Sequence, residues 1–382
     1  MSQRNASGFP TVGMVGAGQL ARMTHAASIP LGVGFRVLAA DPADGAALVC
    51  GDVAIGQHTS LDDLRSFAAG CDVVTFDHEH VPGDHLRALE AEGHVVRPGA
   101  SALLHAQDKQ VMRQRLAPLG VPCPAFAMTE PDDTAKHVRA FAEQHGWPVV
   151  AKTVSGGYDG KGVWVLGAAD DLDVLPPVPL LLEEHVAFRR ELAAVVARSA
   201  YGQAAAYPVV ETVQRDGICV EVLAPAPDLD DERATEAQQL ALRIVGELGV
   251  VGILAVELFD TGTGVVVNEL AMRPHNSGHW TIEGARTSQF EQYLRAVLDL
   301  PLGSPAPIAP VTVMANLLGG ADPRVYDRYV HVMAKDPAVK VHLYGKEIRP
   351  GRKIGHVTAV GDDLGDVRER ARDACDYLRG EA

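Results

Sequence analysis

The first hundred residues alternate between short apolar runs and helical patterns. Three of these runs are rich in β-branched or aromatic residues and predict strands, at residues 11–15, 35–39 and 71–76. A stretch of small residues up to Ile29 predicts a helix after the first strand, and Ser60 with Asp63 predicts a capping box at the start of another. Strands separated by helices predict a parallel, doubly wound sheet, so the chain begins with the pattern of an α/β domain.

After about residue 100 the pattern changes to mostly strands. A predicted helix over 101–119 is ended by Gly120, because glycine readily adopts the left-handed conformation of a helix C-terminus. The apolar runs that follow predict strands at residues 148–152, 163–166, 180–184, 191–197, 203–213, 217–223, 253–259 and 265–270. The tetrapeptide 261–264 predicts a hairpin turn, and one amphipathic helix precedes Gly249. This pattern is typical of an antiparallel α+β domain.

A proline-rich linker over 301–310 leads into a small third unit with three predicted strands and a charged helix over 363–379. We therefore predict a multidomain protein of mixed α/β and α+β class. Its three predicted domains span residues 1–100, 101–300 and 301–382.

The amino-acid composition disfavours several classes of binding partner. The 382 residues carry a formal net charge of −15, which disfavours nucleic acid and anionic membrane surfaces. No segment approaches the ~18 apolar residues of a membrane span, and the first residues lack the apolar run of a signal peptide. The five cysteines lie far apart and form no Cys-X-X-Cys pair, which favours a reducing compartment over a disulfide framework or a zinc site. We therefore expect a cytoplasmic protein.

Two glycine-rich segments are candidates for phosphate binding. Residues 16–18 lie where a strand meets a helix, and free N–H groups at such a junction suit a phosphate. With Asp41 further along, the same turn is compatible with a dinucleotide site, and also with a tight turn that binds nothing. The segment 152–162 contains four glycines together with Lys152 and Lys161, which predicts a mobile flap that covers phosphates. A hairpin with a glycine-rich tip is the alternative for this segment.

Acidic residues at strand positions are candidates for a metal site. Carboxylates within apolar strands are costly to bury unless they are paired or bound to a metal. Glu257 and Glu269 lie on two runs joined by the short hairpin, so their side chains can converge. Two hard oxygen ligands beside a phosphate-covering flap predict Mg²⁺, and outward-facing acids on an exposed strand are the alternative.

Two further segments are candidates for binding an anionic substrate. Residues 273–280 bring a guanidinium, two imidazoles, an amide and a hydroxyl together directly after the predicted metal ligands. Residues 346–353 contain four cations, which suit a phosphate in a chain that is otherwise acidic. A solvated charged loop is the alternative for the second segment.

These motifs together resemble the ATP-grasp superfamily, and within it the family of 5-(carboxyamino)imidazole ribonucleotide synthases. The resemblance runs nearly from end to end and rests on segments 18–20, 157–162, 268–269, 275–280, 288–291 and 349–353. It implies an ATP-grasp fold with an N-terminal Rossmann-like preATP-grasp domain and a small C-terminal domain. It also implies a homodimeric ligase of purine biosynthesis that uses ATP, Mg²⁺ and bicarbonate. Such a ligase carboxylates 5-aminoimidazole ribonucleotide through carboxyphosphate and releases ADP and phosphate.

The resemblance also implies roles for individual residues. ATP would contact the flap, the adenine-binding strand and the metal site, through Lys109, Lys152, Gly157, Tyr158, Asp159, Gly160, Lys161, Gly162, Val163, Glu183, Glu184, His185, Val186, Glu191, Gln214, Asn268 and Glu269. The ribonucleotide and bicarbonate would contact Gln19, Glu79, His275, Asn276, Ser277, Lys346, Arg352 and Lys353. The metal ligands would be Glu257 and Glu269, and the catalytic residues would be Tyr158, Asp159, Lys161 and Arg273.

Several positions depart from the pattern of this family, among them Lys109 and Gln214, and three other functions compete with it. Lys109 replaces a usual arginine but keeps its charge, and Gln214 replaces a frequent histidine near the nucleotide. An NAD-dependent oxidoreductase would leave the flap and the paired acids without a role. Other ATP-grasp ligases, such as a biotin carboxylase or the formate-dependent glycinamide ribonucleotide transformylase, are disfavoured by the string at 275–280. A non-catalytic nucleotide-binding regulator would be expected to have lost the metal carboxylates.

Overall fold

The computed structural model describes residues 8–157 and 160–381. Its N-terminal part contains a four-stranded parallel sheet with the order β3-β2-β1-β4. The strands are β1 (Thr11–Val15), β2 (Gly34–Ala39), β3 (Val53–Ile55) and β4 (Val73–Phe76). Helix α1 (Gln19–Leu31) packs on one face, and α2 (Leu61–Ala68) and α3 (Gly83–Ala91) pack on the other. The predicted doubly wound sheet is confirmed, although the sequence pattern does not predict the short, partly exposed β3.

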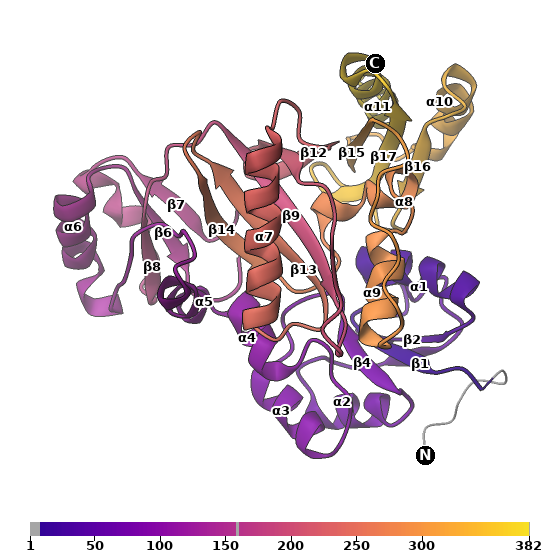
Figure 1. The fold of residues 1–382 in the computed structure, drawn as a ribbon, viewed down its shortest axis with the longest axis horizontal. Helices are drawn as coiled ribbons and strands as arrows, with labels where there is room; N and C mark the ends of the chain where they lie inside the picture. The colour runs from indigo at the N-terminus through magenta and orange to yellow at the C-terminus, as the bar shows by residue number, and fades with distance from the viewer. Residues whose placement is uncertain (1–7, 158–159, 382) are drawn as a thin grey trace.

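A second, antiparallel sheet of four strands has the order β5-β8-β6-β7. It consists of β5 (Phe126–Met128), β6 (Val149–Thr153), β7 (Val163–Leu166) and β8 (Leu180–Glu184). Helix α6 (Thr134–His145) covers it and buries Val138 and Phe141 against Val149 and Leu182. Figure 1 shows this sheet and α6 at one end of the molecule. The glycine-rich segment of the sequence joins β6 to β7, so it connects two neighbouring strands of this small sheet.

The third sheet has nine strands and forms the centre of the molecule. Its order is β14-β13-β9-β11-β12-β15-β17-β16, with β10 paired to β9. Its strands are β9 (Arg190–Arg198), β10 (Ala204–Ala206), β11 (Val210–Arg215), β12 (Ile218–Ala224), β13 (Gly252–Asp260), β14 (Val265–Ala271), β15 (Val311–Leu318), β16 (Lys340–Leu343) and β17 (Lys353–Gly361). Every pair of neighbours is antiparallel, as the sequence pattern predicts for the strands of the middle segment.

Side-chain alternation along the central strands separates two cores. Leu254 and Val256 pack in one core with α7 (Asp231–Glu247), which crosses the sheet in Figure 1. Ile253 and Ala255 pack in the other core with α9 (Gln289–Val297). Because side chains of a strand alternate between faces, Glu257 belongs to the face opposite α7. The alternation of side chains along β13 therefore determines the face of the sheet on which the candidate metal ligands lie.

The C-terminal segment contributes three strands to this same sheet rather than building a sheet of its own. Strand β15 pairs with β12, and β17 and β16 follow it in order. Helix α11 (Leu364–Arg379) packs on β15 and β17, next to α10 (Tyr329–Lys335). The predicted helix over 363–379 is therefore present, with Asp363 as its N-cap. The domain boundaries at residues 100 and 300 stay a prediction.

Three local predictions are wrong, each for a physical reason. The helix over 101–119 is broken into α4 (Ala100–Gln107) and α5 (Lys109–Leu116), because Asp108 is extended and accepts a hydrogen bond from the Val111 N–H. The strand over 203–213 is split around Pro208, which has no N–H to give to a sheet. The carboxylate of Asp63 accepts from the Gln57 N–H instead of completing the capping box. Within the described part of the chain, every helix is too short or too polar to cross a bilayer.

Candidate active site

The candidate residues are held between the small sheet and the central sheet by a buried group of ions. Arg113 of α5 is fully buried, and its Nε atom lies 2.6 Å from Oε1 of Glu183 on β8. The Nζ atom of Lys152 on β6 lies 2.7 Å from the other carboxylate oxygen of Glu183. Burial alone would raise the pKa of Glu183, but Lys152 and Arg113 outweigh it and the pKa is lowered. Glu183 is therefore an ionised anchor for two cations.

The same two cations reach across to the central sheet through Asn268 of β14. Arg113 donates to the Asn268 carbonyl at 2.7 Å, and Lys152 donates to its side-chain Oδ1 at 3.0 Å. Asn268 is the extra residue of a β-bulge, because Glu269 pairs with Glu257 while Val267 pairs with Leu258. A bulge redirects side chains and frees a backbone group from the ladder. The freed carbonyl is thus available to Arg113, and the two sheets are connected.

Three carboxylates gather beside the bulge. Glu257 and Glu269 are direct register partners on β13 and β14, so the predicted convergence of these two acids is present in the structure. Glu191 of β9 lies diagonally across from Glu257, since Glu257 pairs with Ala193 and Phe259 pairs with Glu191. Burial, followed by the charge of Glu257, raises the pKa of Glu191 to about 7. Burial and the neighbouring carboxylate therefore both disfavour ionisation of Glu191.

Each of the two predicted metal ligands contacts a side-chain nitrogen through one oxygen. Oε1 of Glu269 lies 3.1 Å from Nζ of Lys109, and Oε1 of Glu257 lies 3.2 Å from Nε2 of His275. Burial would raise the pKa of Glu257, but the His275 contact dominates and lowers it. Neighbouring carboxylate oxygens of this kind suit Mg²⁺, which takes carboxylate oxygens and retains several waters. The residues present therefore fit the predicted metal.

The glycine-rich flap crosses from the small sheet toward the central sheet. Lys109 donates to the Gly156 carbonyl at 3.1 Å, and its backbone N–H donates to the Val154 carbonyl at 2.9 Å. Gly160 lies against Gly217 in the turn between β11 and β12, where an added Cβ would come within 3.2 Å of the Gly217 Cα. The flap therefore contacts both sheets. Tyr158 and Asp159 lie outside the described residues.

Other predicted ATP contacts surround this group. Glu184 exchanges hydrogen bonds with Ala125, because its N–H donates to the Ala125 carbonyl and its carboxylate accepts from the Ala125 N–H. Gln214 lies half-buried on β11, at the register shift next to β12. The remaining members lie on the flap, at the start of β7 or just after β8, and comprise Gly157, Lys161, Gly162, Val163, His185 and Val186.

The predicted substrate segment over 273–280 is held rigidly. Gln289 of α9 is fully buried and clamps His275 from both sides, accepting from its N–H at 2.9 Å and donating to its carbonyl at 2.7 Å. Nδ1 of His275 lies 2.9 Å from the hydroxyl of buried Ser277, which follows Asn276 in a short 3-10 helix. These bonds orient the imidazole so that its Nε2 faces Glu257.

Glu79 and Arg273 form an ion pair between the N-terminal part and this segment. Nε of Arg273 lies 2.8 Å from Oε2 of Glu79, whose Oε1 accepts from the Met272 N–H at 3.0 Å. Burial would lower the pKa of Arg273, but Glu79 outweighs it and the pKa is raised. The pair therefore stays ionised and keeps the guanidinium near the carboxylate cluster.

The cationic loop over 346–353 approaches the N-terminal helix. Lys346 donates to the Gln19 side-chain oxygen, and its Nζ lies 5.7 Å from the centre of the Tyr344 ring. Arg352 is exposed and donates to the Glu347 carbonyl at 3.4 Å, and Lys353 begins β17. The structure thus brings Gln19 and Lys346 together from opposite ends of the chain.

At residues 16–18, where the sequence allows a phosphate site, a dinucleotide site or a turn that binds nothing, the structure places a carboxylate of the chain itself. The Gly18 N–H at the start of α1 donates to the buried carboxylate of Asp77 at 2.6 Å. Gly16 has a φ of 100°, and a Cβ there would lie 1.8 Å from Asp77 Oδ1. Glycine is required because Asp77 occupies the space. A carboxylate at the helix N-terminus takes the place that a phosphate would need.

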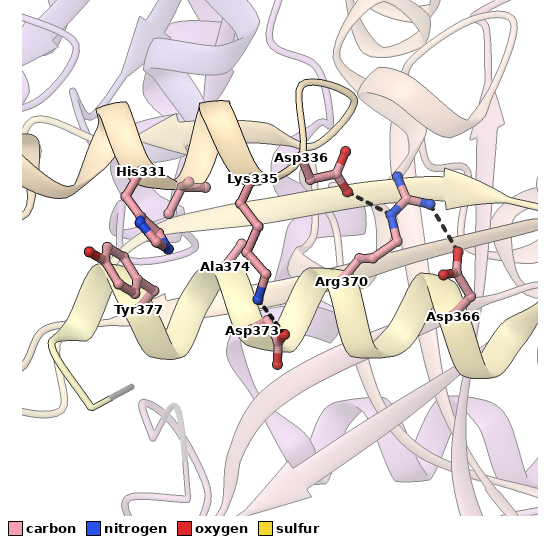
Figure 2. Close-up of a pocket in the computed structure, with 9 residues that line it drawn as sticks. His331, Lys335, Asp336, Asp366, Arg370, Asp373, Ala374 and Tyr377 are labelled. Atoms are coloured by element: carbon pink, nitrogen blue, oxygen red, sulfur yellow. Dashed lines mark hydrogen bonds and ion pairs between the residues drawn. The ribbon is translucent and has the colours of Figure 1, made fainter.

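A hollow with a volume of about 450 Å³ lies elsewhere, between α10 and α11 (Figure 2). Its charged residues neutralise one another through the pairs Lys335–Asp373, Arg370–Asp336 and Arg370–Asp366. It contains none of the predicted site residues. A groove whose cations are already paired does not suit a phosphate-bearing substrate.

Sequence reasoning missed three residues that organise the site: Arg113, Gln289 and Asp77. Arg113 and Gln289 are fully buried, yet in the sequence they look like the polar positions of helices. Each is defined by partners at least 14 positions away in the chain, such as Glu183, His275 and Gly18. The one signal available for Gln289 was its place in the matched segment 288–291.

Three families match consecutive parts of the chain. They are described as the Ribonucleotide synthetase preATP-grasp domain over residues 9–107, the ATP-grasp domain over 114–290 and the Phosphoribosylaminoimidazole carboxylase C-terminal domain over 312–370. The N5-carboxyaminoimidazole ribonucleotide synthase of Mycobacterium bovis is 56% identical over 97% of this chain and 88% of its own. The enzyme of the same name from Corynebacterium ammoniagenes is 48% identical over 98% and 94%.

Solved structures give the same result. The N5-carboxyaminoimidazole ribonucleotide synthetase of Thermus thermophilus superposes with a TM-score of 0.86 at 37% identity, covering 97% of this chain and 99% of that one. An Aspergillus clavatus N5-carboxyaminoimidazole synthase, solved with ADP and 5-aminoimidazole ribonucleotide, has a TM-score of 0.89 at 31% identity. It covers 97% of this chain and 98% of its own. These similarities extend over all three sheets.

The buried ion group gives a stability prediction. We expect Arg113→Met to lower the free energy of unfolding by about 3 kcal/mol, because it leaves Glu183 with one cation in a buried position. Arg115→Met, on the same helix, removes an exposed pair with Glu247 and should change it by less than about 1 kcal/mol. Urea denaturation of both variants measures the difference. Equal losses in the two variants would contradict the anchoring role of Arg113.

The carboxylate cluster gives a pH prediction. The pKa of Glu191 is raised from 4.5 to about 7, so its ionisation destabilises the folded chain. This cost is absent well below pH 4.5 and complete above about pH 7. Glu191→Gln cannot ionise, so its melting temperature should rise relative to that of the wild type between pH 5 and pH 8, without Mg²⁺ or nucleotide. A melting-temperature difference that is independent of pH would remove Glu191 from the crowded cluster.

Proposed function

Because the chain belongs to the N5-carboxyaminoimidazole ribonucleotide synthase family, we propose that its carboxylate cluster and flap bind ATP and Mg²⁺ for the reaction of that family. The chain is an ATP-grasp ligase that converts 5-aminoimidazole ribonucleotide to its N5-carboxylated product in purine biosynthesis. The observation that carries the proposal is the meeting of Lys109, Lys152, Glu257 and Glu269 from two sheets and a helix.

ATP is proposed to lie between the small sheet and the central sheet, under the flap. Lys109 and Lys152 then neutralise phosphate charge, and the glycine N–H groups of the flap donate to phosphate oxygens. The backbone at Glu184, His185 and Val186 reads the adenine edge. Glu191 contacts the ribose, a role that its pKa of about 7 favours because a protonated carboxyl can also donate a hydrogen bond.

Glu257 and Glu269 are proposed to hold Mg²⁺. Bound there, the ion neutralises the charge of the transferring phosphoryl group. The contacts of these carboxylates with His275 and Lys109 support the proposal, since they hold the two acids in place beside each other. Asn268 supplies an amide oxygen next to them and is oriented by Lys152.

Phosphorylation of bicarbonate is proposed as the first chemical step. A bicarbonate oxygen attacks the γ-phosphorus, the bond to ADP breaks and carboxyphosphate forms. Arg273, kept ionised by Glu79, and His275 and Asn276 border the bicarbonate. The clamped geometry of His275 supports this role, because a group that is already oriented loses less entropy when the reactants bind.

Carboxylation of the imidazole amine is proposed as the second step. The amine nitrogen attacks the carboxyl carbon, phosphate leaves, and the amine loses a proton. Asp159 is the proposed acceptor and Tyr158 its neighbour at the imidazole, with Lys161 at the phosphates. Carboxyphosphate hydrolyses readily, so closure of the flap over both sheets protects it from water.

The ribonucleotide phosphate is proposed to lie against the cationic loop. Lys346, Arg352 and Lys353 supply positive charge, and Gln19 and Glu79 approach from the N-terminal part. The contact between Lys346 and Gln19 supports this assignment, because it joins the loop to the start of α1. A homodimer and a cytoplasmic location belong to the same proposal.

The competing functions fit less well. A dinucleotide site at residues 16–18 would place a phosphate where Asp77 accepts from the Gly18 N–H, and like charges would repel. A regulator without catalysis would not need two carboxylates in register beside two lysines. Both alternatives also leave the cationic loop unused.

Metal dependence gives the first functional test. We expect Glu269→Gln to lower Mg²⁺-dependent ADP release by at least about 100-fold, because one of two proposed metal ligands is lost. Glu247→Gln, an exposed position on α7, is the matched control and should retain wild-type rates. A coupled assay with ATP, bicarbonate or the ribonucleotide omitted in turn measures the rate. Near-normal activity of Glu269→Gln would rule out Glu269 as a ligand.

Substrate phosphate binding gives the second functional test. We expect Lys353→Ala to raise KM for the ribonucleotide about 10-fold or more with little change in kcat, since a hydrogen bond to a charged group contributes ~1.5–3 kcal/mol. Lys340→Ala, exposed on the edge strand β16, is the control. Steady-state kinetics with the ribonucleotide varied measures both constants. An unchanged KM in Lys353→Ala would assign the phosphate to other residues.

A further inference from the structure

A second group of potential metal ligands lies away from the carboxylate cluster. It consists of Glu283 on α8 (Thr281–Gly284), His342 on β16 and His356 on β17. One ligand atom from each residue lies within 4.8 Å of the other two. None of these residues belongs to the nucleotide or substrate positions proposed above. The group connects the helix after the substrate segment with the two outermost strands of the central sheet.

The ring of His356 is positioned to act as a metal ligand. It is fully buried, and its Nδ1 lies 2.7 Å from the hydroxyl of Tyr344. Its other nitrogen, Nε2, is buried and has no hydrogen-bond partner in the described part of the chain. A buried polar nitrogen without a partner is costly, so something is expected to occupy this position.

The other two residues supply the remaining donors. His342 pairs in register with His356 across β16 and β17, and the two rings stack 4.5 Å apart. Nε2 of His342 lies 2.7 Å from Oε1 of Glu283, while Oε2 of Glu283 is buried without a partner in the described residues. Two imidazole nitrogens and a carboxylate oxygen therefore meet at one place with two donor atoms unsatisfied.

We propose that Glu283, His342 and His356 bind a divalent transition metal of the zinc class. Two histidines and one glutamate are a ligand set that zinc takes with a fourth position open to water. Imidazole nitrogen distinguishes this site from a magnesium site, which prefers oxygen ligands only. Tyr344 contacts Nδ1 of His356, the ring nitrogen that would not bind the metal. A hydrogen-bond partner on that second nitrogen fixes the orientation of a ligating histidine.

Binding requires a small local movement. Ligands about 2.0–2.1 Å from a tetrahedral ion lie roughly 3.4 Å apart, so His342 and Glu283 must separate by about 0.7 Å and lose the proton they share. The His342 ring must also turn out of the stack toward the lone pair of His356. Its strand is the edge of the sheet, and its side chain is 28% exposed, which gives both freedom to move and a path for the ion.

A metal here would fasten the substrate segment to the cationic loop. The ring of His279 in the substrate segment also stacks with the ring of His356, at 5.2 Å, and its Nδ1 lies 3.4 Å from the Tyr344 hydroxyl. Glu283 lies four residues further along the chain, and His342 precedes Lys346 by four residues. The ion would thus join the two segments that the proposed function assigns to bicarbonate and phosphate.

Metal binding to the chelator-treated protein without nucleotide tests the proposal. We expect one equivalent of Zn²⁺ in competition with a chromophoric indicator, and Co²⁺ should give the visible absorption of a four-coordinate ion. His342→Gln should raise Kd by more than the roughly 10–100-fold that losing an outer partner causes, and Tyr344→Phe should raise it within that range. Glu283→Gln provides a second ligand variant.

A matched control uses the other histidine group of the chain. His58 contacts the ring of His78 at 4.7 Å, so His58→Gln removes one imidazole from a different cluster and should leave Kd unchanged. Circular dichroism and melting temperature without metal verify that each variant is folded. The absence of a stoichiometric metal, or binding in folded His342→Gln and Glu283→Gln that equals the wild type, would overturn the proposal and leave a polar cluster filled by water.

Discussion

The interaction on which the rest of the structure depends is the buried contact of Glu183 with Arg113 and Lys152. The side-chain nitrogens of Arg113 and Lys152 lie 2.6 and 2.7 Å from one carboxylate. Charged groups are stable in the interior only when they are paired with the opposite charge and hydrogen-bonded. The same cations continue to Asn268, so the group ties the small sheet to the central one. It also determines where Lys152, which we propose to neutralise phosphate charge, can lie.

Around this buried ion group, two irregular segments of backbone position the candidate site residues. The bulge at Asn268 lets consecutive residues serve the site, and the break at Asp108 starts α5 so that Lys109 reaches both the flap and Glu269. In a regular strand, Asn268 and Glu269 would point to opposite faces of the sheet. In an unbroken helix, Lys109 would point in a different direction from the one it takes at the start of α5. The carboxylates gathered there would be stabilised by a divalent cation.

Much of the fold could be predicted from periodicity, and the acid pair could be predicted from the hairpin that joins its strands. Glu257 and Glu269 lie either side of a short turn, so local pairing brings them together. Features that depend on distant partners could not be predicted. Asp77 fills the glycine turn from 59 residues away, and Arg113 is buried by residues of two other elements. Periodicity reports which face of an element is apolar, but it does not report which polar residue another part of the chain will bury.

Nucleotide-dependent binding of Mn²⁺, used in place of Mg²⁺ and followed by electron paramagnetic resonance, tests most directly whether the two register-paired carboxylates form the metal site. The wild-type protein should remove one additional equivalent of free Mn²⁺ signal when a non-hydrolysable ATP analogue is present. The double variant Glu257→Gln with Glu269→Gln should lose that increment while remaining folded. An increment of the same size and affinity in the double variant would contradict the proposed site.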